Sequence, residues 1–338
     1  MFSSALEEII AAKKVIVMQA ENPDGDSLGS ALALEELLAE NGKDVVLYCA
    51  IALPKYLHYI QGWDRVDSEW ANDADLAIIV DTAAEALLQQ ALTQPGVRHF
   101  LETHPVVILD HHEESSETLP FTATIVNEPS AVATGELIYN IAKEAGWTIT
   151  PAAAENLFIA IQSDSLGLTT PSTTAESYYV AADLVACGAI PATIEERRRE
   201  YMKKPADILA YKGVLLQRVE YYLDGKLALV HIPWEEIEEY SDKYNPSVLV
   251  LDEMRMVEGV AVAVAIKTYP DGKLTGKIRV NTPVADSIAG YFGGGGHAYA
   301  AGFKVFETYD AIIPELITAT EKALREHEQE QEQPESHS

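Results

Sequence analysis

Short apolar runs alternate with helix-like segments through the first third of the chain. Four runs are rich in valine and isoleucine and end in polar or acidic residues, which is typical of buried strands. They cover residues 15–19, 45–49, 76–81 and 106–110. Between the first two runs, residues 27–41 place apolar side chains at helical spacing and close on Asn-Gly. This strand–helix–strand order predicts an α/β fold with a parallel sheet covered by helices.

The pattern changes in the second half of the chain. Residues 151–161 and 174–187 are predicted helices, and the highly charged segment 192–204 predicts an exposed helix that joins two domains. Beyond about residue 208, apolar runs and a Pro-Asp-Gly turn predict a smaller, mixed α/β domain. Its predicted strands cover residues 228–232, 247–251, 259–267 and 274–281. The predicted division is 1–190 for the first domain, 191–207 for a helical linker, 208–325 for the second domain and 326–338 for a disordered acidic tail.

The net charge narrows the range of partners. The 338 residues include 24 Lys and Arg against 53 Asp and Glu, which gives a net charge of −29. Proteins that track long nucleic acid usually present a basic groove, so we expect no long duplex nucleic acid as a partner. A small anionic substrate stays compatible with this charge if a bound cation reverses the local potential. The alternative is an acidic surface that serves only solubility.

The sequence gives no sign of membrane insertion or secretion. No run of about 18 apolar residues is present. The first fourteen residues carry acids within their apolar stretch and lack a basic start, unlike a signal peptide. Cys49 and Cys187 are the only cysteines, too few for a disulfide framework. We therefore expect a cytoplasmic protein without a membrane partner.

Acidic residues directly follow two of the predicted strands. Asp24 and Asp26 stand two residues apart on a Pro/Gly turn, so both carboxylates can point at one cation or at a pair. The helix start at Gly29 and Ser30 adds free amides that suit an anion. Asp81 ends another strand. Each signal has a plain alternative, because Asp-Gly-Asp is a common surface turn and an aspartate after a strand often caps a helix.

The segment Asp110-His111-His112 is more specific, because paired histidines after an acid and a buried strand indicate metal ligation. Imidazole and carboxylate ligands suit Mn²⁺, and leave Fe²⁺, Co²⁺ or Zn²⁺ open. Asp164 follows a predicted helix. Ligands of parallel sheets gather at the carboxyl ends of the strands, so these segments predict a site for two metals about 3.5–4 Å apart. The predicted metal ligands are Asp24, Asp26, Asp81, His111 and Asp164.

The order of these motifs resembles the DHH phosphoesterase family with its DHH-associated C-terminal domain. The segments NPDGDSLGS, VDT, DHH and SDS are followed far downstream by GGGGHAYAAGF, so the resemblance spans residues 15–303. The chain is similar to the stand-alone oligoribonuclease and phosphoadenosine-phosphate phosphatase branch. RecJ-type exonucleases share the core but are usually longer, and family pyrophosphatases carry a different C-terminal domain. The resemblance implies hydrolysis of short oligoribonucleotides or 3′-phosphoadenosine 5′-phosphate by water that two metal ions activate.

The resemblance also implies a role for each motif residue. Asp24 would bind the first manganese ion, Asp26 the second, and Asp81 both, while His111 and Asp164 would complete the second site. His112 and Asp110 would be catalytic, with His112 beside the phosphate as a hydrogen-bond or proton-transfer residue. The substrate-binding residues would be Arg279, Gly294, Gly295, Gly296 and His297. Two Mn²⁺ ions are the expected cofactor, with Mg²⁺, Co²⁺ or Fe²⁺ as alternatives, and a short RNA or small nucleotide is the expected partner, with a homodimer left open.

One position departs from the family pattern. A histidine three residues before the motif proline would bind the first metal, and Ala20 stands there instead. Gln19, Glu21 or water would have to fill the gap, or the first metal is weakly bound. Three readings follow: a phosphoesterase for short RNA or 3′-phosphoadenosine 5′-phosphate, a phosphodiesterase for cyclic or linear dinucleotides, and a nucleotide-binding protein with reduced catalysis.

Overall fold

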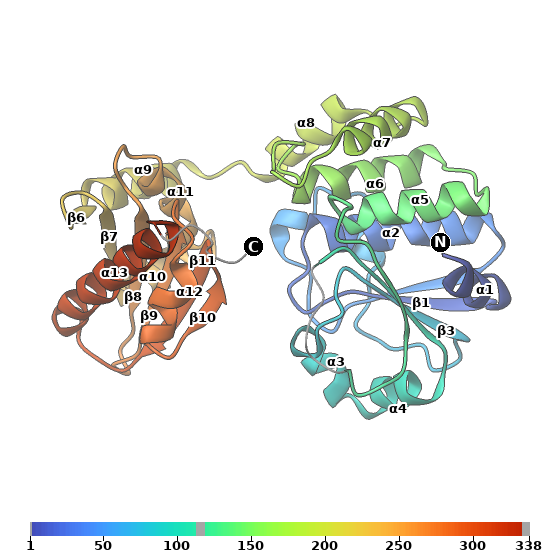
Figure 1. Cartoon of the computed structure of the whole chain (residues 1–338), viewed down its shortest axis with the longest axis horizontal. Helices are drawn as coiled ribbons and strands as arrows, with labels where there is room; N and C mark the ends of the chain where they lie inside the picture. The colour runs from blue at the N-terminus through green and yellow to red at the C-terminus, as the bar shows by residue number, and fades with distance from the viewer. Residues whose placement is uncertain (1, 113–118, 333–338) are drawn as a thin grey trace. The chain divides into compact units, whose positions relative to one another are not determined.

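The computed structural model describes residues 2–112 and 119–332 (Figure 1). The chain divides into two compact units, Met1–Lys203 and Lys204–Ser338. Each unit has its own sheet and is described by itself. The boundary between them falls inside the segment 191–207, where a linker is predicted.

The first unit is built on a parallel sheet of five strands in the order β2-β1-β3-β4-β5. The strands are β1 (Lys14–Met18), β2 (Asp44–Tyr48), β3 (Leu76–Val80), β4 (Val106–Asp110) and β5 (Thr124–Asn127). The helices are α1 (Ser3–Ala11), α2 (Gly25–Glu40), α3 (Gln89–Thr93), α4 (Pro95–Thr103), α5 (Thr134–Ala145), α6 (Pro151–Asp164), α7 (Ala175–Ala186) and α8 (Pro191–Tyr201), with single 3₁₀ turns η1 (Lys55–Leu57), η2 (Trp63–Arg65) and η3 (Glu85–Leu87). The predicted parallel α/β architecture is confirmed, and β5 is an addition to the four predicted strands.

Helices cover both faces of this sheet, which explains the uninterrupted apolar runs of β3 and β4. Helices α2, α5 and α6 pack on one face and α3 and α4 on the other (Figure 1). Strand β1 pairs with β2 on one side and with β3 on the other, so the strand order reverses there. Ligands of open α/β sheets bind outside the carboxyl ends of the strands at such a point, and the sequence places its acidic motifs at these ends.

Helix α8 packs on the first unit, although the sequence predicts an exposed linker there. Ile194 is buried in the same core as α2 and α6, and Arg197 pairs with Glu155 of α6. The rest of α8 is charged and mostly exposed, which is why its sequence resembles a free linker. Within the described residues no single helix is long and apolar enough to cross a membrane, and the one helix pair that passes on combined length and composition, α7 with α8, is bent by 93°.

The second unit is built on a mixed sheet of six strands in the order β10-β11-β9-β8-β7-β6. Only the β7–β8 pair is parallel among the described strands of this sheet. The strands are β6 (Glu220–Tyr222), β7 (Leu227–Ile232), β8 (Val262–Thr268), β9 (Leu274–Val280), β10 (Gly295–His297) and β11 (Ala300–Val305). The helices are α9 (Ala206–Gln217), α10 (Trp234–Tyr240), α11 (Leu251–Arg255), α12 (Ala285–Tyr291) and α13 (Tyr309–Glu332), with the 3₁₀ turn η4 (Pro246–Leu249). Helices α12 and α13 pack on one face, and α9, α10 and α11 on the other. The predicted mixed α/β class is confirmed.

The predicted strand at 247–251 is wrong, because this segment forms η4 and the start of α11. The side chain of Asn245 accepts a hydrogen bond from the backbone nitrogen of Ser247 at 3.2 Å, and Pro246 occupies the first turn position. Both features favour a helical start. The apolar run is buried against the sheet, so its pattern alone did not distinguish a strand from a buried helical turn.

The predicted disorder from residue 326 is also wrong for the residues that the structure describes. Helix α13 continues to Glu332. Glutamate and glutamine are good helix formers, and Lys322 lies 3.8 Å from Glu326, one turn along the helix. Low hydrophobicity therefore marks a solvated helix end here. Residues 333–338 lie outside the described part of the chain.

Candidate metal centre

The loop from β1 into α2 orients Asp24 and Asp26. Asp24 caps α2: its Oδ1 atom accepts hydrogen bonds from the backbone nitrogens of Asp26 and Ser27, both at 3.0 Å, and Ser27 Oγ accepts one from the Asp24 nitrogen. Asp24 is half-buried, and burial raises its pKa. Both aspartates are therefore held at the start of α2, Asp24 as its N-cap and Asp26 in its first turn.

Asp26 is fully buried at the N-terminus of α5. Its Oδ2 atom accepts a hydrogen bond from the backbone nitrogen of Thr134 at 2.7 Å, and its Oδ1 atom accepts from the nitrogen of Gly135 and the hydroxyl of Ser30, both at 3.0 Å. Such donors stabilise an anion. Burial and the charge of Asp164 nevertheless raise the pKa of Asp26 to about 6. Hydrogen bonds thus hold the Asp26 carboxylate in place although another negative charge lies nearby, an arrangement that suits a cation site.

Asp81 follows β3 with a left-handed backbone, at a φ of 66°. Aspartate tolerates this conformation better than most residues, although it carries strain. The side chain is buried, and its Oδ1 atom accepts a hydrogen bond from the hydroxyl of Thr134 at 3.0 Å. Burial, followed by the charges of Asp26 and Asp24, raises the pKa of Asp81 well above its ordinary value. The backbone turn directs this carboxylate toward the others.

Asp110 and His112 form a short hydrogen-bonded pair at the end of β4. His112 Nδ1 lies 2.7 Å from Asp110 Oδ1, which also accepts from the backbone nitrogens of His111 and His112. Burial alone would raise the pKa of Asp110, but the hydrogen bonds from His112 outweigh it and hold that pKa below its ordinary value. The side chain of His112 is 57% exposed, so the ring lies at the surface of the site.

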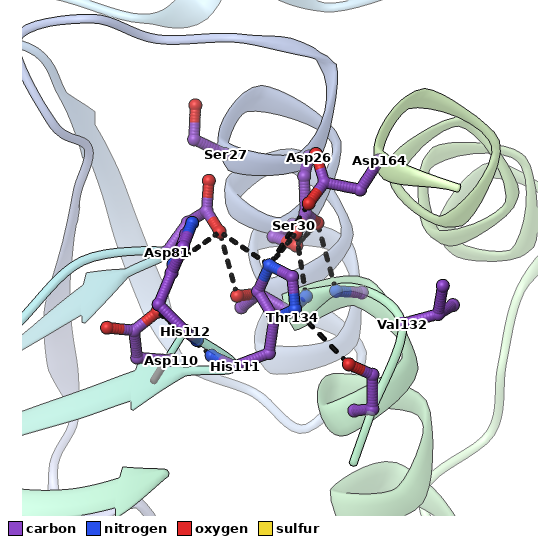
Figure 2. Close-up of polar contacts among 12 residues, drawn as sticks. Asp26, Ser27, Ser30, Asp81, Asp110, His111, His112, Val132, Thr134 and Asp164 are labelled. Atoms are coloured by element: carbon purple, nitrogen blue, oxygen red, sulfur yellow. Dashed lines mark hydrogen bonds and ion pairs between the residues drawn. The ribbon is translucent and has the colours of Figure 1, made fainter. Parts of the chain in front are cut away.

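His111 faces three carboxylates from three different elements. Its Nε2 atom lies 3.1 Å from Asp164 Oδ2, 3.6 Å from Asp26 Oδ2 and 3.7 Å from Asp81 Oδ1. The other ring nitrogen, Nδ1, lies 3.2 Å from the carbonyl oxygen of Ala131. Burial alone would lower the pKa of His111, but the close contact with Asp164 and the charge of Asp26 raise it to about 9. Figure 2 shows the imidazole between these carboxylates.

The donor set fits a divalent cation. A carbonyl can only accept, so Nδ1 of His111 carries a proton, and in the neutral ring the lone pair of Nε2 points at the carboxylates. This buried Nε2 atom lies close to the three carboxylates but has the geometry of a hydrogen bond to none of the described residues. Two overlapping groups have ligand atoms within 4.8 Å of one another: one contains Asp81, His111 and His112, the other Asp26, His111 and Asp164. A bound cation would satisfy the lone pair and the carboxylates together.

The structure therefore brings together most of the predicted metal ligands. Asp26, Asp81, His111 and Asp164 share one cluster at the carboxyl end of the sheet. Asp24 belongs to neither group, although its charge raises the pKa of both Asp26 and Asp81. His112, predicted as catalytic, lies at the rim, 3.9 Å from Asp81. Their roles as ligands and catalytic residues stay predictions.

At position 20 the expected histidine ligand is missing, and the structure leaves one neighbouring side chain as a candidate to replace it. The carboxylate of Glu21 accepts a hydrogen bond from the backbone nitrogen of Gln90. Gln19 is buried, and neither polar atom of its side-chain amide has a partner in the described part of the chain. An unpaired buried amide is costly, by about 1–3 kcal/mol. Of the substitutes that the sequence offers, Gln19 is thus the one left free to bind an ion or a water.

Two residues of the site escaped the sequence prediction. Thr134 and Gly135, at the start of α5, donate the hydrogen bonds that fix Asp26 and Asp81. The available signal was a Thr-Gly helix start after a small-residue segment. That signal predicts a helix but does not show which residues the start of this helix contacts. The contact joins residues more than a hundred positions apart, so only the tertiary fold shows it.

The C-terminal candidates lie on neighbouring strands of the second sheet. Arg279 on β9 is half-buried, and its Nη1 atom donates to the carbonyl of Ile278 at 2.9 Å. Ala300 of β11 pairs with both Arg279 and His297, so these two residues lie in one row across the sheet. The side chain of His297 lies outside the described residues.

The glycine run packs tightly against β11. A Cβ atom on Gly294 would collide with the backbone of Gly302, and one on Gly296 would lie 2.6 Å from the carbonyl oxygen of Ala300. Gly295 has open space around it. Two of the three glycines predicted to bind substrate are therefore required by packing, whatever they bind.

Comparison with known proteins agrees with this architecture. Residues 14–161 match the model of the DHH family, N-terminal domain. The chain is 24% identical over 319 residues to the bifunctional oligoribonuclease and PAP phosphatase NrnA of Bacillus subtilis, covering 93% of this chain and 96% of that protein. It is 26% identical over 260 residues to the cyclic-di-AMP phosphodiesterase GdpP of the same organism, covering 71% of this chain and 37% of that protein.

A solved structure shares the fold of the whole chain. It belongs to an exopolyphosphatase-related protein from Bacteroides fragilis, with a TM-score of 0.82 and 20% identity, covering 98% of this chain and 97% of that one. The match to the family model runs from β1 into α6 and includes the predicted ligands Asp24, Asp26, Asp81 and His111. The chain therefore resembles the DHH family in its N-terminal domain and bifunctional oligoribonucleases and PAP phosphatases over most of its length.

Proposed function

We propose that this protein is a metal-dependent phosphoesterase that hydrolyses short oligoribonucleotides or 3′-phosphoadenosine 5′-phosphate. The observation that carries the proposal is the cluster in which the buried Nε2 atom of His111 lies 3.1–3.7 Å from carboxylates of Asp26, Asp81 and Asp164. The similarity to an oligoribonuclease and PAP phosphatase over 93% of the chain supports the substrate class. Two Mn²⁺ ions are the cofactor that we propose, and the cytoplasm is the expected compartment.

The residues of the cluster would have different roles in the reaction. Asp24, Asp26, Asp81, His111 and Asp164 would hold the metals. When bound, these ions would neutralise the charge of a phosphoryl group and activate water. Asp110, ionised and hydrogen-bonded to Nδ1 of His112, fixes the orientation of that ring. The hydrogen bond with Asp110 raises the pKa of His112, and the protonated ring could then donate from Nε2 to a phosphate oxygen or give that proton to the leaving group.

The second unit would bind the substrate. We infer that it is the DHH-associated domain, from its GGGGH segment and its mixed sheet. Arg279 would hold a phosphate with its guanidinium, which has the geometry for paired hydrogen bonds to such an anion. Gly295 and the backbone around it would offer amides to the same ligand.

A second candidate function is hydrolysis of cyclic or linear dinucleotides. The similarity to a cyclic-di-AMP phosphodiesterase over 71% of this chain favours it. The same metal cluster and the same arginine would serve both substrates, so the site does not separate them. The third interpretation is a nucleotide-binding protein with reduced catalysis. It is suggested by Ala20, which stands in place of the expected histidine ligand.

A substrate panel separates these functions. We expect turnover with Mn²⁺ of 3′-phosphoadenosine 5′-phosphate and of 5′-phosphorylated diadenylate, and kcat/KM that falls as RNA grows from two to about ten nucleotides. The net charge of −29 repels additional phosphates, so the fall should be steeper at low ionic strength, where screening is weak. Preferred turnover of cyclic dinucleotides would select the second function. Binding without turnover of any substrate would select the third, and better turnover of long strands at low salt would contradict the proposal.

A further inference from the structure

Three cations lie on one face of the second sheet, outside the metal cluster. Lys277 and Arg279 are two residues apart on β9, so their side chains leave the same face. Lys267 on β8 pairs with Thr275, the next position of β9 on that face. We call Lys267, Lys277 and Arg279 the cation stripe.

Small residues flank the stripe on both neighbouring strands. Arg279 pairs with Ala263 of β8 and Ala300 of β11. Lys277 pairs with Ala265 of β8 and Gly302 of β11 in the same way. Directly opposite positions are those where side chains interact most. Because these neighbours are short, the long cationic side chains extend beyond them.

The stripe has no acidic partner in the described chain. Lys267 Nζ donates to Asn245 Oδ1 at 2.9 Å, Arg279 bonds only a backbone carbonyl, and none of the three cations makes an ion pair with a described carboxylate. The pKa of Lys267 is lowered to about 8 by burial and by the charge of Lys277, and that of Lys277 is lowered by desolvation and by Arg279. In a chain with 53 acids, this crowding of like charges without a counter-charge indicates a surface kept for an anion.

We propose that the second unit binds two phosphate groups of one ligand, the first at Arg279 and the second between Lys267 and Lys277. Positions two apart on a strand are about 7 Å from each other, so the two phosphates belong to separate positions of a nucleotide. The ligand class is a nucleoside bisphosphate or a 5′-phosphorylated dinucleotide. The proposal rests on the proposed function and extends it, because it adds Lys267 and Lys277 to the substrate site.

Equilibrium binding to the metal-free full-length chain tests this without turnover. Adenosine 3′,5′-bisphosphate and AMP are titrated calorimetrically into the parent chain, Lys277→Gln and Lys267→Gln. The parent should prefer the bisphosphate, and each variant should lower the ratio of bisphosphate to AMP affinity about tenfold. The salt dependence of bisphosphate binding should also weaken, by about one in the slope of log affinity against log salt. The control is Lys322→Gln on α13, whose side chain is 57% exposed and paired with Glu326; it should change neither ratio nor slope.

The outcomes are separable from those of the substrate panel. An unchanged affinity ratio in Lys277→Gln and Lys267→Gln, with melting temperatures equal to the parent, would overturn the second phosphate site. An equal loss in Lys322→Gln would reduce the effect to overall charge and overturn it as well. Because no metal is present, failure of hydrolysis in the panel leaves this result standing, and failure here leaves the panel standing.

Discussion

Replacing Asp81 by asparagine should lower phosphoester turnover at least about a thousandfold and raise the melting temperature of the metal-free protein. The loss of activity follows from removing a carboxylate that would bind both metals, which supply several kcal/mol of charge stabilisation. The gain in stability follows from burial and the neighbouring Asp26 and Asp24, which disfavour a charged Asp81. Asparagine tolerates the φ of 66° and still accepts the hydrogen bond from Thr134.

The matched control is Asp252→Asn on α11, where the side chain is 71% exposed and only 3.4 Å from Arg255. This change should leave both turnover and melting temperature close to the parent, because exposed ion pairs contribute little. Turnover is measured with Mn²⁺ and melting in the presence of a chelator. Normal turnover in Asp81→Asn would remove the bridging role. A lower melting temperature would show that the apo cluster is stabilised by that charge.

Gly135→Ala should destabilise the first unit by about 1–3 kcal/mol and impair metal binding with it. A Cβ atom there would lie 2.5 Å from Cβ of Ala160 on α6, so the two helices must separate. The backbone nitrogen of Gly135 also fixes Asp26 Oδ1, and any shift of α5 moves that carboxylate. Denaturant unfolding and Mn²⁺ affinity measure the two effects.

The control for this substitution is Gly213→Ala in α9. A Cβ atom at Gly213 meets nothing within 4 Å, so only the helix propensity changes, and we expect stabilisation by about 0.5–1 kcal/mol. Stability of Gly135→Ala equal to the parent would show that α5 and α6 have room between them. Loss of stability with unchanged Mn²⁺ affinity would separate the helix contact from the metal centre.

The clustering of Asp26, Asp81, His111 and Asp164 was predictable because these residues stand in short, recognisable segments, and their role as metal ligands stays a prediction. Asp81 and His111 directly follow parallel strands, which bring their carboxyl ends to one edge, while Asp24 and Asp26 stand at the start of α2 and Asp164 ends α6. Thr134 and Gly135 were not predictable, because a Thr-Gly helix start has no sequence mark that points to Asp26. The motifs identified the predicted ligands, whereas the residues that donate hydrogen bonds to those ligands became apparent only from the fold.

The second unit was less predictable, and for different reasons. The run 247–251 is apolar but helical, since a buried turn and a buried strand share the same hydrophobicity. The cation stripe depends on the pairing of β8 and β9, which the sequence of either strand does not contain. Arg279 was identified from the family resemblance, whereas Lys267 and Lys277 became apparent only from the register.

Titration of Mn²⁺ into the metal-free chain, with hydrolysis of 5′-phosphorylated diadenylate followed in the same samples, tests the central proposal most directly. We predict two ions per chain with unequal affinities, because Ala20 removes a ligand of the first metal, and turnover that rises as the weaker site fills. Two equally tight sites would mean that Gln19 or another group replaces the missing histidine. Hydrolysis that persists in excess chelator, or one that never appears although both ions bind, would contradict a two-metal phosphoesterase.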